Sequence, residues 1–230
     1  MVALDTDKVI ILILIPYILF GIAYYSSHKG KPAWFTRKLI HTFGLAIVGL
    51  YGSTLNNLQE VFYVFFVFLG ILVILSLIPN LRLFQSLIEK GTRTGEKKSE
   101  SIINTTLTSI SMLTLLVVSF DQRWLFFAGA LAVAIGDGLG EFVGRPYGKH
   151  KYHIFSDKSI EGSLGVFFGT LVGILISFTY FDLDELSLIF FSAIILASLV
   201  ATLIEAFSVS FVDNVLIPWG VAGVLFLLLN

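Results

Sequence analysis

Four acidic residues lie beside long apolar segments of this 230-residue chain, where an ionised carboxylate is costly. Asp137 and Glu141 are four residues apart, so they share one face of a helix. Asp213 and Asn214 begin the last apolar segment, and Glu205 lies near the end of the segment before it. Carboxylate and amide oxygens are typical ligands of Mg²⁺ bound next to phosphates. The pattern therefore indicates a cation site built from several helices.

Two of these acids raise a question of charge compensation. We expect a helix that ends near residue 142, which places Asp137 near the C-terminus, where the macrodipole disfavours an anion. A bound cation such as Mg²⁺ would offset that cost. Glu205 has three ways to avoid the cost of burial: it binds a cation, it pairs with a Lys or Arg of another segment, or it stays protonated.

Basic residues open the second apolar segment. Arg37 and His41 are four residues apart on one helix face, with Lys38 between them. Arg37 and Lys38 alone are typical of side chains that anchor a helix at the membrane surface. His41 lies one turn deeper, where an ionisable residue usually faces a cavity or a partner.

A third polar segment, residues 158–163, opens another apolar run. Lys158 stands beside small residues at the expected start of a helix, and the free backbone N–H groups of such a start favour phosphate. Helix capping by Asp157 or Ser159 is the structural alternative, and it would suffice to explain Glu161 in the first turn.

The composition defines the class of protein. The chain is 56% hydrophobic and 13% charged, with a mean hydropathy of +0.90, whereas soluble domains are about 25% charged. These values predict an integral membrane protein rather than a soluble enzyme. The absence of cysteine excludes disulfides, thiolate metal sites and thiol catalysis. Nothing in the pattern supports nucleic-acid binding.

The predicted fold is all-α: a polytopic membrane helix bundle that forms one domain over residues 1–230. Apolar runs long enough to cross a bilayer predict about eight spans, at residues 8–25, 34–53, 60–78, 101–119, 122–142, 159–180, 185–208 and 213–229. Nearly all Lys and Arg residues fall in segments 26–38, 80–100 and 143–158. The positive-inside rule then places these segments in the cytoplasm and both termini outside.

Two of these segments carry further expectations. Residues 80–90 have the periodicity of an amphipathic helix at the membrane surface, followed by a polar loop that is either a solvated connector or a lid over a nucleotide. Residues 143–158 are predicted to form the active-site loop. Glycines spaced by four residues, from Gly136 to Gly148 and from Gly165 to Gly173, predict close helix packing.

The polar motifs resemble those of CTP-using membrane enzymes. Asp137 is followed by the pattern G-x-x-x-G-R-P-x-G-K-H-K over residues 140–151 and by K-S-x-E-G-S over residues 158–163. The phosphatidate cytidylyltransferases share such a motif with the dolichol, phytol and CTP-dependent diacylglycerol kinases. The early R-K-x-x-H of residues 37–41, and Glu205 followed by Asp213-Asn214, resemble the polyprenol and phytol kinase branch.

This resemblance implies a kinase that transfers the γ-phosphate of CTP to a lipid alcohol such as phytol, geranylgeraniol, farnesol or dolichol. The transfer would occur at the cytoplasmic membrane face, and the enzyme would contact CTP, the alcohol and membrane lipids. We assign Mg²⁺ to Asp137 and Asp213, with Asn214 or Glu161 completing its ligands. Either Glu205 or His41 would accept the hydroxyl proton. The predicted phosphate-binding residues are Arg37, Lys38, Lys149, Lys158, Ser159, Gly162 and Ser163.

Three alternatives are kept beside this interpretation. A cytidylyltransferase would use the same nucleotide and metal but release pyrophosphate and form a CDP-lipid. A CTP-dependent kinase of diacylglycerol would differ only in the acceptor. A small transporter would place charged residues at mid-membrane in broken helices, whereas the acids here gather at one predicted face.

Overall fold

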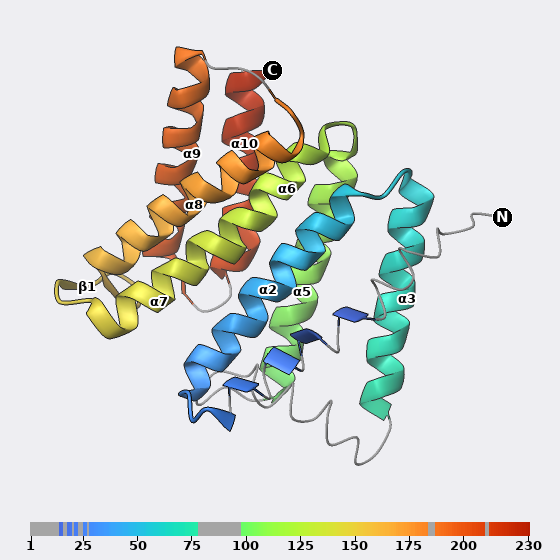
Figure 1. The fold of residues 1–230 in the computed structure, drawn as a ribbon, viewed down its shortest axis with the longest axis horizontal. Helices are drawn as coiled ribbons and strands as arrows, with labels where there is room; N and C mark the ends of the chain where they lie inside the picture. Colours follow the sequence, from blue (N-terminus) through green and yellow to red (C-terminus); the bar gives the residue numbers. More distant parts are fainter. Residues whose placement is uncertain are drawn as a thin grey trace.

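The computed structural model describes residues 28–77, 98–183, 187–209 and 212–230, together with four pairs of residues between 14 and 26. This part of the chain is mostly helical, as predicted (Figure 1). The predicted first span, 8–25, falls largely outside the described residues, as does nearly all of segment 80–100. The long helices are α2 (Ala33–Ser53), α3 (Leu58–Leu77), α5 (Lys98–Val118), α8 (Ile160–Tyr180), α9 (Leu188–Phe207) and α10 (Val212–Leu229).

One further helix is longer than the sequence predicts. The helical stretch covers Phe120–Tyr147 and consists of η1 (Phe120–Gln122), α6 (Arg123–Leu131), the π-helical turn η2 (Ala132–Asp137) and α7 (Gly138–Tyr147). The expected end near residue 142 is therefore wrong, and the macrodipole argument for Asp137 fails with it. Asp137 lies inside the helix, at the end of a π-helical turn, a feature that is frequent at functional sites.

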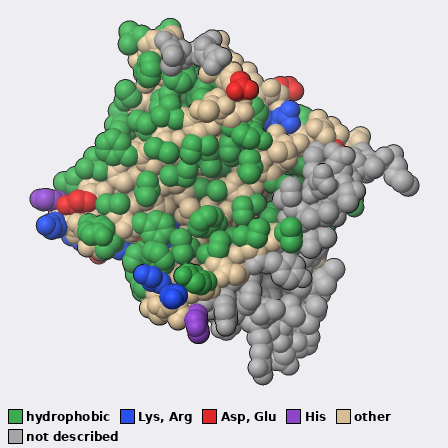
Figure 2. All heavy atoms as spheres, viewed as in Figure 1, with side chains coloured by type: hydrophobic (Ala, Val, Ile, Leu, Met, Phe, Trp, Pro, Cys, Tyr) green, Lys and Arg blue, Asp and Glu red, His purple; other side chains and the backbone are tan. Residues whose placement is uncertain are grey.

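Four helical stretches of the described residues are long and apolar enough to cross a membrane: Phe120–Tyr147, Ile160–Tyr180, Leu188–Phe207 and Val212–Leu229. Shorter apolar helices cover Leu58–Val67 and Ile103–Val118. Hydrophobic side chains cover most of the face shown in Figure 2, and charged side chains lie toward its edges. The arrangement is consistent with a membrane protein.

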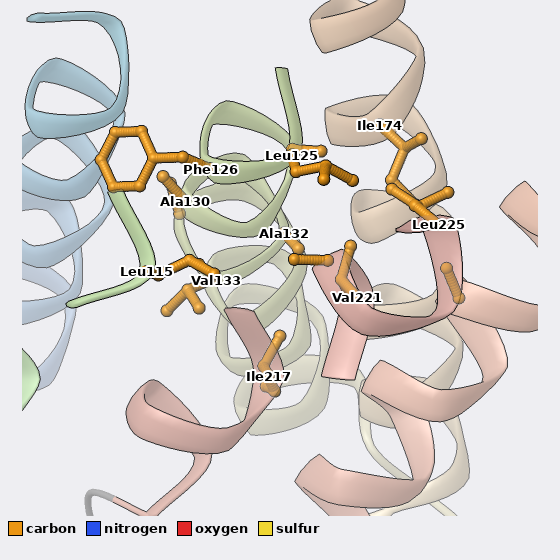
Figure 3. Packing of buried hydrophobic residues seen from close by; sticks show 14 of the residues in the cluster. Leu115, Leu125, Phe126, Ala130, Ala132, Val133, Ile174, Ile217, Val221 and Leu225 are labelled. Carbon is orange, nitrogen blue, oxygen red and sulfur yellow. The ribbon is translucent and has the colours of Figure 1, made fainter. Parts of the chain in front are cut away.

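The core forms around the Phe120–Tyr147 stretch, which we call the central helix. Ala130, Ala132 and Val133 are buried where α6 and η2 pass between α5, α8 and α10 (Figure 3). Larger side chains from the surrounding helices, such as Ile174 and Val221, fill the space beside these small residues. Because the central helix is enclosed, it holds Asp137 in a fixed frame.

The glycine spacing has the structural consequence that the sequence predicts. A Cβ added at Gly140 would lie 2.5 Å from Val166 Cγ2, and one at Gly144 would lie 3.1 Å from the Cα of Gly162. A Cβ at Gly169 would lie 2.7 Å from the carbonyl oxygen of Ile135. The backbones of α7 and α8 therefore approach closely, which confirms the packing prediction.

Between these two helices the chain forms a hairpin rather than a loop. Strands β1 (Lys151–His153) and β2 (Asp157–Ser159) pair antiparallel, with Tyr152 opposite Lys158. The prediction of an active-site loop over residues 143–158 is therefore wrong for the end of α7 and for both strands. A two-stranded pair this short carries no periodic signal that separates it from a loop.

Candidate active site at the polar end of the bundle

The first turns of α2 bring basic side chains against the central helix. Lys38 is buried, with 3% of its side chain exposed, and its Nζ lies 2.5 Å from Asp137 Oδ2 and 3.3 Å from Glu141 Oε2. A lysine in this position is an internal counterion, so the surface-anchor interpretation fails for Lys38. The charge that compensates Asp137 here comes from a side chain of another helix.

Glu141 joins three basic residues. Arg37 Nη2 donates to both of its carboxylate oxygens at 2.7 Å, and Arg145 Nε donates to Oε1 at 2.7 Å. The Arg145 guanidinium also lies over the ring of Trp34, 5.3 Å from its centroid. Glu141 belongs to the acids that the sequence singles out beside Asp137, but neither its pairing with Arg37 nor a role for Arg145 was predicted. Their spacing of four residues on α7 is the signal that could have found the pair.

His41 connects the central helix to α10. Its Nε2 lies 3.1 Å from Asn214 Oδ1 and 3.7 Å from Asp137 Oδ2. Both side chains therefore surround one imidazole nitrogen, although they are far apart in the sequence. The structure brings together the Arg37–Lys38–His41 motif, the Asp137 motif and the start of α10, as the sequence analysis expected.

The start of α10 adds a second acid to this region. Asp213 is buried, and its Oδ1 accepts a hydrogen bond of 2.8 Å from the backbone N–H of Asn214. A carboxylate in the first turn of a helix is favoured by the macrodipole. Asp213 is thus held in place by the local structure of α10 beside the His41 contact.

Lys158 of β2 pairs with Glu205 of α9. Its Nζ donates to Glu205 Oε1. Of the three ways in which Glu205 could avoid the cost of burial, the structure thus shows pairing with a basic residue of another segment. Burial by itself lowers the pKa of the Lys158 ammonium. The charge of Glu205 and the hydrogen bond to it, with the charges of Asp213 and Asp137, outweigh that effect and raise this pKa above its ordinary value. Lys158 is therefore a cation that several acids share.

The second oxygen of Glu205 is distinctive. Glu205 is 7% exposed, and its Oε2 has no hydrogen-bond partner among the described residues. A buried carboxylate oxygen without a partner is costly to maintain. Such an oxygen is a candidate to accept a proton or to meet a ligand.

The start of α8 uses its polar groups mainly for structure. Ser159 Oγ accepts a hydrogen bond of 3.1 Å from the backbone N–H of Gly162, which is the capping alternative, and Gly162 packs against Gly144. Ser163 Oγ shares a hydrogen bond of 2.6 Å with the Tyr152 hydroxyl. These three predicted phosphate-binding residues are thus engaged within the hairpin and the helix start.

Two other predicted residues lie away from the Lys38–Asp137 contact. The carboxylate of Glu161 pairs with His150, with 2.7 Å between Oε1 and Nδ1. Lys149 is exposed at the start of the hairpin. Among the described contacts, none joins Glu161 or Lys149 to Asp137 or Asn214.

The donor set suits Mg²⁺ bound through few protein ligands. Within the described residues, no group of three or more His, Asp or Glu side chains is placed to hold a metal ion. However, Mg²⁺ is usually bound through one or two carboxylates, with phosphates and water as further ligands. Buried Asp137 and Asp213, the Asn214 amide and the unpartnered Glu205 Oε2 supply oxygen atoms of that kind.

Comparison with known proteins adds one relative. A stretch of 96 residues is 32% identical to a phytol kinase of Synechocystis sp. (strain ATCC 27184 / PCC 6803 / Kazusa), covering 41% of this chain and 40% of that protein. No family model matches the chain, and no solved structure matches it. The chain thus aligns with about two fifths of the length of this curated relative, and the match supports the resemblance to the polyprenol and phytol kinase family.

Proposed function

We propose that this chain is a membrane lipid kinase that transfers the γ-phosphate of CTP to the hydroxyl of an isoprenoid alcohol. Phytol, geranylgeraniol, farnesol and dolichol-type polyprenols form the acceptor class. The observation that carries the proposal is the convergence of Lys38, Asp137, Asn214, Lys158 and Glu205 from four helices and a hairpin. The similarity to a phytol kinase supports the acceptor class, and the motif resemblance supports CTP as donor.

The physical setting suits this reaction. An isoprenoid alcohol keeps its tail in the bilayer and offers its hydroxyl near the surface, while a nucleotide stays in water. Transfer must then take place near the membrane surface. The polar cluster includes the first turns of α2 and α10 and the last turn of α9. In the proposal the chain has eight spans with both termini outside, and this end of the bundle faces the cytoplasm.

The basic residues have a role in placing the nucleotide. Phosphoryl transfer depends on positioning and on neutralising charge, more than on covalent chemistry by the protein. In the proposal Arg37, Lys38 and Lys158 exchange carboxylate partners for phosphate oxygens when the nucleotide binds. Lys149, exposed at the start of the hairpin, contributes a further charge.

Glu205 is the favoured proton acceptor. The alcohol oxygen forms a bond to the γ-phosphorus, the bond from that phosphorus to the bridging oxygen breaks, and CDP leaves. The hydroxyl proton passes to Glu205 Oε2, which has no other partner among the described residues. His41 instead positions Asn214 and Asp137, because its Nε2 is already placed between them.

Asp137 and Asp213, with Asn214, would hold Mg²⁺, which when bound neutralises charge on the nucleotide phosphates. Glu161 is a less favoured ligand, because its carboxylate is engaged by His150 in the hairpin. Lys38 and Lys158 keep the acids of the site compensated before nucleotide arrives.

The position of a radioactive label tests the proposal. The purified protein in lipid nanodiscs is given CTP labelled at either the α- or the γ-phosphate, with ATP as a competing donor. The acceptors, tested one at a time, are phytol, geranylgeraniol, a long polyprenol, diacylglycerol and phosphatidate. We expect label in the isoprenoid product from γ-labelled CTP alone. Label from the α-phosphate would indicate a cytidylyltransferase, and preference for diacylglycerol would indicate the other kinase. Transfer to none of the acceptors would refute an enzyme of this class.

A further inference from the structure

The turn of the β1–β2 hairpin exposes apolar side chains that the proposed reaction does not use. Ile154 is 40% exposed and Phe155 is 64% exposed. Ser156 Oγ donates a hydrogen bond of 3.2 Å to the carbonyl oxygen of Ser208, at the end of α9. The neighbours of Ser208, Phe207 and Val209, are also exposed. We call Ile154, Phe155, Phe207 and Val209 the hairpin patch.

Basic residues flank this patch. Lys149 and His150 are exposed just before β1, and Lys151 and His153 are exposed on β1 itself, which leads to the turn. Residues 145–161 contain four Lys or Arg and two Asp or Glu, a net charge of +2 with histidine neutral. An apolar surface with a basic border matches the chemistry of an anionic membrane surface, which attracts Lys and Arg and accepts apolar side chains.

The position of the hairpin agrees with this chemistry. It joins the last turn of the Phe120–Tyr147 helix to the first turn of the Ile160–Tyr180 helix, and both are long and apolar enough to span a membrane. The hairpin therefore lies within a few residues of the bilayer surface. Tyr147, which precedes it, is exposed, and tyrosine is enriched at membrane–water interfaces.

We propose that the hairpin patch inserts into the headgroup layer of an anionic leaflet and fixes the hairpin at that depth. The same strands carry Lys158, which pairs with Tyr152 in the register and with Glu205 across to α9. Membrane insertion of the turn would thus set the position of a site residue. The inference goes beyond the proposed reaction and does not depend on it.

The experiment uses the absence of cysteine, since one introduced cysteine gives one labelled position. Phe155→Cys carries a spin label at the turn, and Asp157→Cys is the matched control, because the Asp157 side chain is 90% exposed on the second strand. The full-length protein is placed in nanodiscs with or without anionic phospholipid. Electron paramagnetic resonance measures how often the spin label collides with dissolved oxygen, which concentrates in the bilayer. The same measurement is made with a water-soluble nickel chelate, and the two accessibilities are compared.

We expect the label at 155 to favour oxygen and to lose access to the nickel chelate, most strongly with anionic lipid. The label at 157 should favour the chelate in both lipids. Ile154→Cys gives a second reading of the turn if the Phe155 variant is poorly folded. Equal access to the chelate at 154, 155 and 157 would overturn the proposal. So would shielding of 155 from both reagents, which would indicate a protein partner. Neither reading requires phosphorylation activity, so failure here is distinct from failure of the proposed kinase.

Discussion

Replacing Lys38 by methionine tests the ion pair at the centre of the site. The lysine side chain is 3% exposed, and its Nζ lies 2.5 Å from Asp137 Oδ2. Methionine keeps an unbranched apolar chain but leaves the Asp137 carboxylate without the lysine charge, whereas Glu141 keeps its contacts to Arg37. Removing one partner of a buried pair costs about 3–5 kcal/mol. We expect Lys38→Met to lower the free energy of unfolding by that amount.

Replacing the acidic partner, Asp137, should lower the free energy of unfolding by less than Lys38→Met does. Asp137→Asn leaves an amide oxygen that can accept from Lys38, and it leaves Glu141 Oε2 3.3 Å from the ammonium. The bond from Lys38 thus loses the negative charge of its acceptor but not the acceptor itself, so the cost should not exceed the roughly 1.5–3 kcal/mol of a hydrogen bond to a charged group. The loss of unfolding free energy in the double variant should be smaller than the sum of the losses in the two single variants, by about 1 kcal/mol or more, because the two residues are in contact.

The assay is reversible unfolding in mixed detergent micelles, followed by helical circular dichroism, with Lys151→Met as the control for an exposed lysine. That control should lie within about 0.5 kcal/mol of the parent. The reasoning is refuted if Lys38→Met is as stable as the control, or if the effects of Lys38→Met and Asp137→Asn simply add.

Three further changes test packing, catalysis and charge geometry. Gly140→Leu should cost about 1–3 kcal/mol of unfolding free energy by overpacking α7 on α8, whereas Gly223→Leu, where an added Cβ meets nothing within 4 Å, should leave the melting temperature nearly unchanged. Glu205→Gln should reduce kcat for isoprenoid phosphorylation by about 10²–10⁴-fold, with circular dichroism as the check on folding; an unchanged kcat would exclude Glu205 as the base. Arg37→Lys should lose the two-oxygen contact with Glu141 and cost about 1–3 kcal/mol in the same unfolding assay, because lysine cannot reproduce it. Stability equal to the parent would contradict that contact.

The positions of most described helices could be predicted because each coincides with an apolar run of about the length that crosses a bilayer. The apolar runs at 34–53, 159–180 and 185–208 correspond to α2, α8 and α9 within a few residues. The glycine spacing also predicted a contact between helices, since a run of small residues has few other uses within a membrane. Four stretches are long and apolar enough to span, and the number eight stays a prediction.

Other features depend on tertiary contacts that no local pattern contains. Lys38 and Asp137 are 99 positions apart, and helical periodicity does not say which helices become neighbours. The charges could therefore be assigned to one face, but not paired. The continuation of the central helix beyond residue 142 to Tyr147 was missed because Gly144 and Pro146 weaken helix propensity, while close packing of Gly144 against Gly162 of α8 sustains the helix.

Binding of Mn²⁺ in place of Mg²⁺ tests most directly whether Asp137 and Asp213 serve one nucleotide site. Electron paramagnetic resonance of the protein in nanodiscs with CTP measures how many Mn²⁺ ions bind and how tightly. Asp182→Asn is the control, because Asp182 is an exposed acid after the end of α8. We predict one nucleotide-dependent Mn²⁺ in the parent and in the control, and weakened binding in both Asp137→Asn and Asp213→Asn. Parent-like Mn²⁺ affinity in either of the two site variants would contradict a shared metal–triphosphate site.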